Sequence, residues 1–216
     1  MNFDDFIYLQ LPLLNYLEEG KQSQCQAISL PDAEMVMYPS LFCENESDKI
    51  FAELYQTIEW KQEDTYLYGK KVAIPRLTAW YGDQGKAYTY SKIKMEPQPW
   101  ISILEKIKFQ VEKLCEEKFN SVLLNLYRDG KDSIAWHSDD EKELGKNPTI
   151  GSLSFGGTRI FMFRHRFKRE LKFNVQLTHG SFLLMKGTTQ HYWQHQIPKT
   201  RPPVKPRINL TFRKII

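Results

Sequence analysis

The feature that most constrains the fold of this chain is a change of pattern near Phe119. Beyond that point apolar and polar residues alternate with a period of two, as they do in half-buried β-strands. Turn-forming pairs such as Asp129-Gly130, Asn147-Pro148 and Gly156-Gly157 separate the runs. The expected strands cover residues 121–127, 149–155, 158–163, 174–177, 181–185, 191–194 and 207–213. Many short strands at this spacing predict an antiparallel sandwich or barrel.

The first half of the chain carries the helical signals. A helix that Asn45 or Ser47 would cap is predicted by the spacing of its apolar residues, which are Ile50, Phe51, Leu54, Tyr55 and Ile58. A second helix is expected after Pro99, and residues 34–38 alternate as a strand does. Helices placed before strands predict an α+β fold with N-terminal helices and a double-stranded β-helix, or jelly roll, as its core.

Charge is distributed unevenly, although its net value is only +4. Residues 1–48 contain nine acidic residues and one basic residue, whereas residues 159–216 contain thirteen basic residues and one acidic residue. A basic block of this size favours a polyanionic partner such as nucleic acid; the alternative is an ordinary solvated surface. We expect an acidic arm at residues 1–30 and a single domain at 31–216, with the jelly-roll core at 119–216.

Composition argues against two broad classes of protein. The chain has 216 residues, of which 41% are apolar and 26% charged, and no apolar run approaches the length that spans a bilayer. The acidic segment from Met1 to Phe6 lacks the basic start of a secretory signal. Three cysteines without paired spacing favour a reducing, intracellular location, cytoplasmic in a bacterium or nuclear in a eukaryote. We expect a monomer with no membrane partner.

The segment Trp136-His137-Ser138-Asp139 places an imidazole and a carboxylate two residues apart. In extended chain the side chains of His137 and Asp139 point to the same side and can bind one metal ion. A histidine from a distant strand would complete a set of two histidines and one carboxylate, which suits non-haem Fe(II). A lone His-x-Asp is a weak signal, since an ordinary surface turn also contains it.

The expected last strand, from Arg207 to Arg213, has a polar face and an apolar face. Its polar face contains both arginines together with Asn209 and Thr211. If both faces are covered, the buried arginines require anions. A dicarboxylate of about five carbons fits between them, gripped by paired hydrogen bonds. The alternative is an exposed edge strand with solvated arginines.

A third set of polar residues lies in the strand expected at 121–127. Asn125 and Tyr127 share one face of that strand and are spaced to hydrogen-bond the same dicarboxylate. The alternative is a tyrosine that packs at a strand end beside an asparagine preceding the Asp129-Gly130 turn.

Together these motifs resemble the AlkB family of Fe(II)- and 2-oxoglutarate-dependent dioxygenases, which demethylate alkylated bases in nucleic acids. The matching segments are Asn125-Leu-Tyr127-x-Asp129-Gly130, His137-x-Asp139-Asp-Glu141, Ile150-x-x-x-Ser154-Phe-Gly156, Arg164-His165, His195 and Arg207-x-Asn209-x-Thr211-Phe-Arg213. The resemblance covers roughly Lys61 to Ile215 and looks closest to members that act on double-stranded DNA.

The resemblance implies a cofactor, two co-substrates and the residues that hold them. Fe(II) would be bound by His137, Asp139 and His195, and dioxygen would be the second co-substrate beside 2-oxoglutarate. The residues implied for 2-oxoglutarate are Asn125, Tyr127, Arg207, Asn209 and Arg213. His195 is preferred over His191 because the family's last ligand follows an aromatic pair, here Tyr192-Trp193. His191 remains the alternative, since positions 191 and 195 would share one face of a strand.

The resemblance also implies a nucleotide-recognition lid at residues 61–95. The residues implied for substrate binding are Tyr68, Arg76, Tyr88, Tyr90 and Glu141. Tyr90 would stack on a flipped base opposite His137, with Tyr88 and Glu141 near the edge of the base. Tyr68, followed by Gly69, looks like the tip of a hairpin finger that fills the gap left by the flipped nucleotide. The alternative is a surface tyrosine that packs on its own hairpin.

The implied function is direct-reversal DNA repair by a 2-oxoglutarate-dependent dioxygenase. Its substrates would be N-alkylated bases such as N1-methyladenine and N3-methylcytosine in alkylated, duplex DNA. Both bases are cationic and pair poorly, which favours their extrusion and their attraction to Glu141 and the tyrosines. The alternatives are an RNA demethylase of the same family, an oxygenase that acts on protein side chains, and a non-catalytic barrel that binds nucleic acid.

Overall fold

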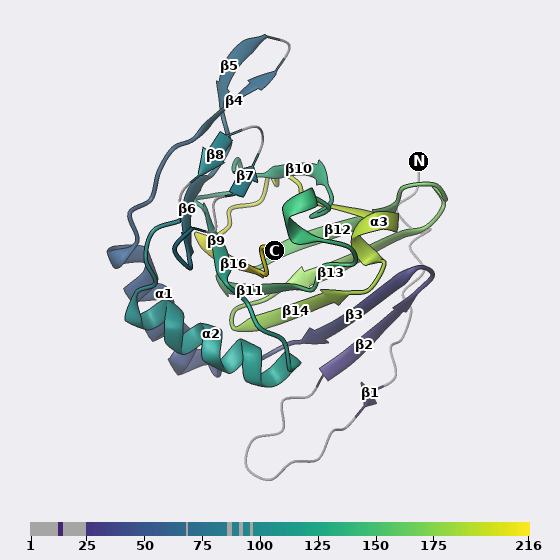
Figure 1. Ribbon diagram of the computed structural model, residues 1–216, viewed down its shortest axis with the longest axis horizontal. Helices are drawn as coiled ribbons and strands as arrows, with labels where there is room; N and C mark the ends of the chain where they lie inside the picture. The colour runs from purple at the N-terminus through teal and green to yellow at the C-terminus, as the bar shows by residue number, and fades with distance from the viewer. Residues whose placement is uncertain (1–12, 15–24, 68, 86–87, 91–92, 96) are drawn as a thin grey trace.

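Two antiparallel β-sheets form the body of the molecule (Figure 1). The structure is a computed structural model that describes residues 13–14, 25–67, 69–85, 88–90, 93–95 and 97–216. The large sheet has the order β1 (Leu13–Leu14), β2 (Cys25–Leu30), β3 (Ala33–Tyr38), β14 (Ser181–Lys186), β11 (Ile150–Gly156), β16 (Arg207–Arg213), β9 (Ser121–Tyr127), β6 (Leu77–Gly82). The small sheet has the order β10 (Ile134–His137), β15 (Trp193–Ile197), β12 (Arg159–His165), β13 (Lys172–Leu177). This architecture confirms the predicted jelly-roll core.

Two helices, α1 (Glu44–Thr57) and α2 (Ser102–Cys115), cover the outer face of the large sheet. Leu54 and Leu104 are fully buried against sheet residues such as Phe212. Burial of each such side chain contributes about 1.5–3 kcal/mol, so the helices are held mainly by packing. In the described part of the chain no helix is long and apolar enough to cross a membrane.

A second apolar core lies between the two sheets. It joins Ile150 and Leu183 of the large sheet to Phe163 and Trp193 of the small sheet. Strand β16 therefore has one face under the helices and the other facing the small sheet, and all seven of its residues are buried. The expectation that both faces of this strand are covered is confirmed.

The start of α1 differs from the predicted one. The helix begins at Glu44, so Asn45 and Ser47 lie inside its first turn and neither is the cap. Cys43 occupies the cap position, and its N–H donates to the Glu46 carboxylate at 3.2 Å. Ser47 is buried and its hydroxyl donates to the Phe42 carbonyl. This local bond to the residue before the cap holds Ser47 within the first turn, although serine usually prefers the cap position.

Residues 191–194 are only partly a strand. Thr189–Tyr192 form a short helix, α3, and β15 starts at Trp193. The argument that positions 191 and 195 share one face of a strand is therefore wrong. His191 instead hydrogen-bonds Asn147 Oδ1 through Nε2 at 2.9 Å, on the surface and away from Asp139.

Two predicted segments, the acidic arm and the lid, each include a strand of the large sheet. Strand β2 pairs with β3, so residues 25–30 of the expected acidic arm belong to that sheet. Within the expected lid, β6 pairs with β9 and is also part of the sheet. The remaining lid strands form two hairpins, β4 (Asp64–Leu67) with β5 (Lys70–Ala73), and β7 (Tyr88–Tyr90) with β8 (Ile93–Met95). The β4–β5 hairpin projects from the body of the molecule (Figure 1).

Candidate metal and co-substrate site

Three side chains from the small sheet and the segment after β10 converge on one point. His137 ends β10, Asp139 follows two residues later, and His195 lies opposite His137 in the neighbouring strand β15. Their ligand atoms all lie within 4.8 Å of one another, and the two Nε2 atoms are 3.2 Å apart. This is the predicted set of two histidines and one carboxylate, with His195 and not His191 as the third member. Such a set suits non-haem Fe(II).

Both histidines are held in the form that a metal requires. His137 Nδ1 lies 2.8 Å from the Ala135 carbonyl, which can only accept, so Nδ1 carries the proton and Nε2 is free to coordinate. Burial lowers the pKa of His137. Burial, together with the neighbouring His137, lowers the pKa of His195 to about 3. Neutral imidazoles at ordinary pH are the ligand form for a divalent metal.

The third ligand is held as an anion. Burial opposes ionisation of Asp139, but the charge of Arg213 and its hydrogen bond to the carboxylate oppose burial, and the pKa of Asp139 is lowered to about 2. Arg213 Nη2 donates to Asp139 Oδ1 at 2.5 Å. The Asp139 N–H donates to Gln190 Oε1 at 3.0 Å, which fixes the backbone beside the carboxylate. Gln190 comes from α3, so this helix supports the site.

The second buried arginine of β16 has spare donors. Arg207 is 1% exposed, and its Nη2 donates to Ser154 Oγ at 2.9 Å. Its Nε and Nη1 atoms are buried and have no hydrogen-bond partner among the described residues. Unpaired buried donors on a guanidinium are costly unless an anion binds them. The residues therefore fit a ligand carboxylate at Arg207.

One cavity is lined both by the triad and by Arg207. Predicted residues Asn125, Tyr127, Asn209 and Arg213 all line it, together with the triad and Arg207. Its apolar lining consists of Leu123, Ile134, Phe161, Leu177, Met185 and Ile197. A cavity in which polar groups converge beside an apolar wall is a usual form of a small-ligand site.

The two predicted asparagines are already engaged within the protein. Asn125 Oδ1 accepts from Arg76 Nε at 2.7 Å. Asn209 Nδ2 donates to Ser152 Oγ at 3.0 Å and to the Leu153 carbonyl at 3.1 Å. These bonds hold the amides in place along one wall of the cavity.

The predicted base pocket is described only in part. Arg76 is 3% exposed and contacts Asn125 and the Ser133 carbonyl, so its guanidinium supports the cavity wall. Glu141 is half-buried, just before a 3-10 turn at Lys142–Leu144. The description of Tyr88 and Tyr90 is confined to the backbone of β7. Tyr68 lies outside the described residues.

Sequence reasoning missed two supporting residues, Ser154 and Gln190. Ser154 lies opposite Asn209 in the β11–β16 register, so the pairing of these strands would have revealed it. Gln190 lies in the short helix α3, before the strand that contains the final ligand His195. It carries no sequence signal of its own.

Residues 34–213 match the 2OG-Fe(II) oxygenase superfamily. The match covers most of the chain and includes the triad and both arginines. The chain therefore belongs to this superfamily, whose cofactor and co-substrates are Fe(II), 2-oxoglutarate and dioxygen.

The curated relatives narrow the assignment to the AlkB family. Human alpha-ketoglutarate-dependent dioxygenase alkB homolog 3 is 43% identical over 192 residues, which are 85% of this chain and 66% of that protein. Human DNA oxidative demethylase ALKBH2 is 40% identical over 189 residues, which are 83% of this chain and 72% of that protein. This chain thus spans just under two thirds of the homolog 3 length. The chain is a member of the AlkB family.

A solved structure agrees with the fold. The structure of OsALKBH1 superposes with a TM-score of 0.59 and covers 94% of this chain and all of the other. The two sequences are 19% identical, so this likeness concerns the fold alone.

Proposed function

We propose that this protein is a Fe(II)- and 2-oxoglutarate-dependent dioxygenase that removes N-alkyl groups from DNA bases. The observation that carries the proposal is the convergence of His137, Asp139 and His195 at one end of a cavity that has Arg207 at its other end. When bound, Fe(II) with 2-oxoglutarate and dioxygen supplies the oxidation of an N-methyl group, which is then lost as formaldehyde.

The protein's own residues bind, orient and exclude water. The neutral histidines and the anionic Asp139 provide the metal ligands, and Arg207 offers its spare donors to the far carboxylate of 2-oxoglutarate. Arg213 lies beside Asp139, where it can pair with the carboxylate of the same ligand that is nearer the metal. The apolar lining keeps water from the reacting atoms.

The substrate class rests on relatives and on charge. One group of relatives is named DNA oxidative demethylase, and the basic third of this chain suits a polyanion. N1-methyladenine and N3-methylcytosine are cationic and pair poorly, so a base-flipping enzyme extracts them at low cost. We propose alkylated duplex DNA as the substrate, and a monomer in a reducing compartment, in keeping with three free cysteines, Cys25, Cys43 and Cys115.

The test is a demethylation assay on matched oligonucleotides that carry N1-methyladenine or N3-methylcytosine. Duplex DNA, single-stranded DNA and RNA are compared with Fe(II) and 2-oxoglutarate, and both formaldehyde and succinate are measured. The proposal expects the fastest repair in duplex DNA and none for Asp139→Ala. Faster repair of RNA would favour the RNA demethylase, and absence of succinate in all three would indicate a non-catalytic barrel.

A further inference from the structure

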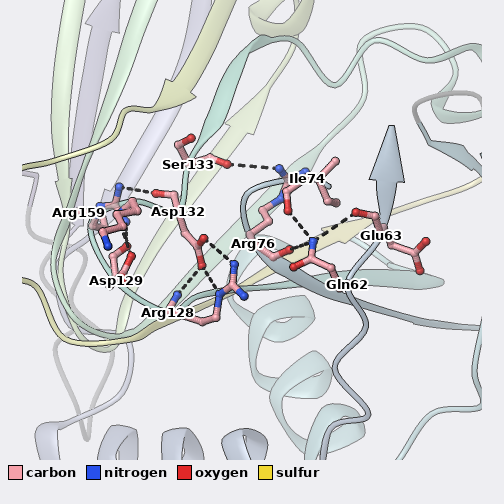
Figure 2. Close-up of polar contacts among 10 residues, drawn as sticks. Gln62, Glu63, Ile74, Arg76, Arg128, Asp129, Asp132, Ser133 and Arg159 are labelled. Carbon is pink, nitrogen blue, oxygen red and sulfur yellow. Dashed lines mark hydrogen bonds and ion pairs between the residues drawn. The ribbon is translucent and has the colours of Figure 1, made fainter. Parts of the chain in front are cut away.

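A buried arginine outside the cavity lining holds two loops together. Arg159 begins β12, is 3% exposed and donates to the main-chain carbonyls of Asp129 (3.2 Å), Asp132 (3.0 Å) and Pro198 (2.6 Å). The first two carbonyls lie in the loop that leads into β10 and the metal ligands, and the third lies directly after β15. Figure 2 shows Arg159 beside Asp129 and Asp132.

Arg159 forms no ion pair in the described part of the chain, and the Asp132 and Asp129 carboxylates offset its charge only in part. Its hydrogen bonds go to carbonyls, which satisfy its donors but carry no net charge. The nearby Asp132 carboxylate is instead bound by Arg128, through Nε at 2.8 Å and Nη2 at 2.9 Å (Figure 2). Burial accordingly lowers the pKa of Arg159.

Arg159 and Arg207 share one aromatic neighbour. Their Cζ atoms lie 5.6 Å and 5.2 Å, respectively, from the centroid of the Tyr127 ring. Burial is the main cause that lowers the pKa of Arg207 to about 10, and the charge of Arg159 adds to it. Two buried cations therefore lie at the end of the cavity away from Asp139, and the described residues form no ion pair with either. Of these three residues Arg207 and Tyr127 line the cavity and Arg159 does not, so Arg159 touches no ligand there and acts on it through its charge.

We propose that Arg159 is a positioning residue that makes this cavity select doubly charged 2-oxo acids over singly charged ones. The distal carboxylate of a dianion offsets the charge of both arginines, because the interior screens charges weakly. A monoanionic 2-oxo acid of the same length has its only carboxylate at the metal end and adds no anion near the two arginines. The inference rests on the proposed use of 2-oxoglutarate and adds the residue that sets its charge selectivity.

The test measures binding without turnover. The full-length protein is loaded with Mn(II), and calorimetry gives the Kd of 2-oxoglutarate and of 2-oxovalerate, which has five carbons and one carboxylate. Arg159→Gln and Arg159→Met remove the charge, and Gln keeps an amide donor for the carbonyls. Arg159→Lys keeps the charge and loses the fork. Arg128→Gln is the matched control, because it loosens the same loop from the solvent side.

We expect both neutral variants to raise the Kd of 2-oxoglutarate about tenfold, which corresponds to about 1.4 kcal/mol. The Kd of 2-oxovalerate should change less than about twofold. Arg159→Lys should restore most of the ratio of the two Kd values, and Arg128→Gln should leave it unchanged even where the melting temperature falls. Equal weakening of both acids, or a ratio unchanged in both neutral variants, would show that Arg159 only holds loops and would overturn the inference. Nucleic acid takes no part in this test, so a failure to demethylate DNA would not affect its outcome.

Discussion

Burial and hydrogen bonding decide the state of each residue in the site. His195 is neutral because it is buried, and Asp139 is anionic mainly because the charged Arg213 lies against it. The same alternation that places His137 beside Asp139 places Arg207 and Arg213 on one face of β16. These four residues were predictable because the members of each pair lie an even number of positions apart in a short extended segment and therefore point to the same side.

The metal ligands lead to the first prediction. His195→Ala should abolish Mn(II) or Fe(II) binding and succinate formation, because it removes one of only three protein ligands. His191→Ala should retain most of both, since His191 lies in α3 and bonds Asn147. Metal titration and succinate measurement check this. Loss of metal binding in the His191 variant alone would contradict the assigned triad.

The arginines of β16 lead to the second prediction. Arg207→Lys and Arg213→Lys keep the charge but lose the planar fork, so the apparent affinity for 2-oxoglutarate should fall tenfold or more, about 1.4 kcal/mol. Saturation curves for 2-oxoglutarate measure this, with Arg128→Lys as an exposed control. Unchanged curves in both variants would mean that the co-substrate binds elsewhere.

Some residues of the site could not be predicted, because their roles depend on distant partners. Arg207 bonds Ser154 across 53 residues, and Asp139 bonds Gln190 across 51. Arg76, which the resemblance implies for substrate binding, bonds Asn125 across 49 residues. The sequence pattern of one segment does not show which side chains it will contact in another. Those contacts follow from how the strands pair.

Among the secondary-structure elements, long periodic segments were predicted well and short ones were not. The strands at 121–127 and 207–213 have the predicted bounds, because each is a run of seven residues. Helix α3 has four residues, too few to show a helical period. Its start is fixed by Thr189, whose hydroxyl donates to the Lys186 carbonyl at 2.6 Å and accepts from the Glu34 N–H at 2.9 Å.

The loop between β9 and β10 leads to the third prediction. Asp132 is 4% exposed, and its carboxylate accepts from Arg128 N, Nε and Nη2. Asp132→Asn should lower the free energy of unfolding at pH 7 by about 1–2 kcal/mol, a modest loss because Arg128 is half-exposed. Asp64→Asn, in a surface pair with Lys71, should cost under about 1 kcal/mol.

The difference in free energy of unfolding between the wild type and Asp132→Asn depends on pH through the pKa of Asp132. Burial would raise this pKa, but the bonds from Arg128 outweigh it and hold it below 3.8. A carboxyl with a depressed folded-state pKa contributes its stability above its unfolded pKa and loses it as the pH falls through the folded value. The wild-type advantage over Asp132→Asn should therefore be constant from neutral pH down to about 5 and shrink below about 4. Urea unfolding across this range measures it, and an advantage that grows on acidification would contradict the assignment.

The β4–β5 hairpin leads to the fourth prediction. Gln62 Nε2 donates to the Ile74 carbonyl at 2.7 Å and also contacts the Arg76 carbonyl, so the base of the hairpin is tied to the body (Figure 2). If Tyr68 is the tip that fills a flipped-out gap, Tyr68→Ala should lower repair of duplex DNA about tenfold and leave single strands nearly unchanged. Tyr66→Ala is the control, since Tyr66 is 73% exposed on the same hairpin. Equal losses on both substrates would assign Tyr68 to packing.

At the scale of the whole molecule, the basic block is less free than its composition suggests. Arg166 pairs with Asp140 at 2.8 Å, and Lys168 pairs with Asp32 at 3.2 Å. Asp32 comes from the acidic first third of the chain, so part of the charge gradient is neutralised by folding. Sequence counts could predict the excess of charge but not its pairing, which depends on where the β2–β3 turn lies against the β12–β13 turn.

The unpaired remainder of this basic block leads to the last prediction. Arg169 and Lys172 are exposed near the β12–β13 turn, and neither forms an ion pair among the residues that the structure describes. If they contact phosphates, Arg169→Glu with Lys172→Glu should weaken DNA binding and reduce the slope of log K against log salt by about 2. DNA-independent succinate formation should not change, because neither residue lines the cavity. Lys106→Glu with Lys113→Glu makes the same charge change on α2, which packs on the opposite face of the large sheet from the small sheet, and should affect DNA binding much less. Fluorescence anisotropy at several salt concentrations measures all three proteins, and an equal loss in the two double variants would mean that net charge, rather than this surface, attracts the DNA.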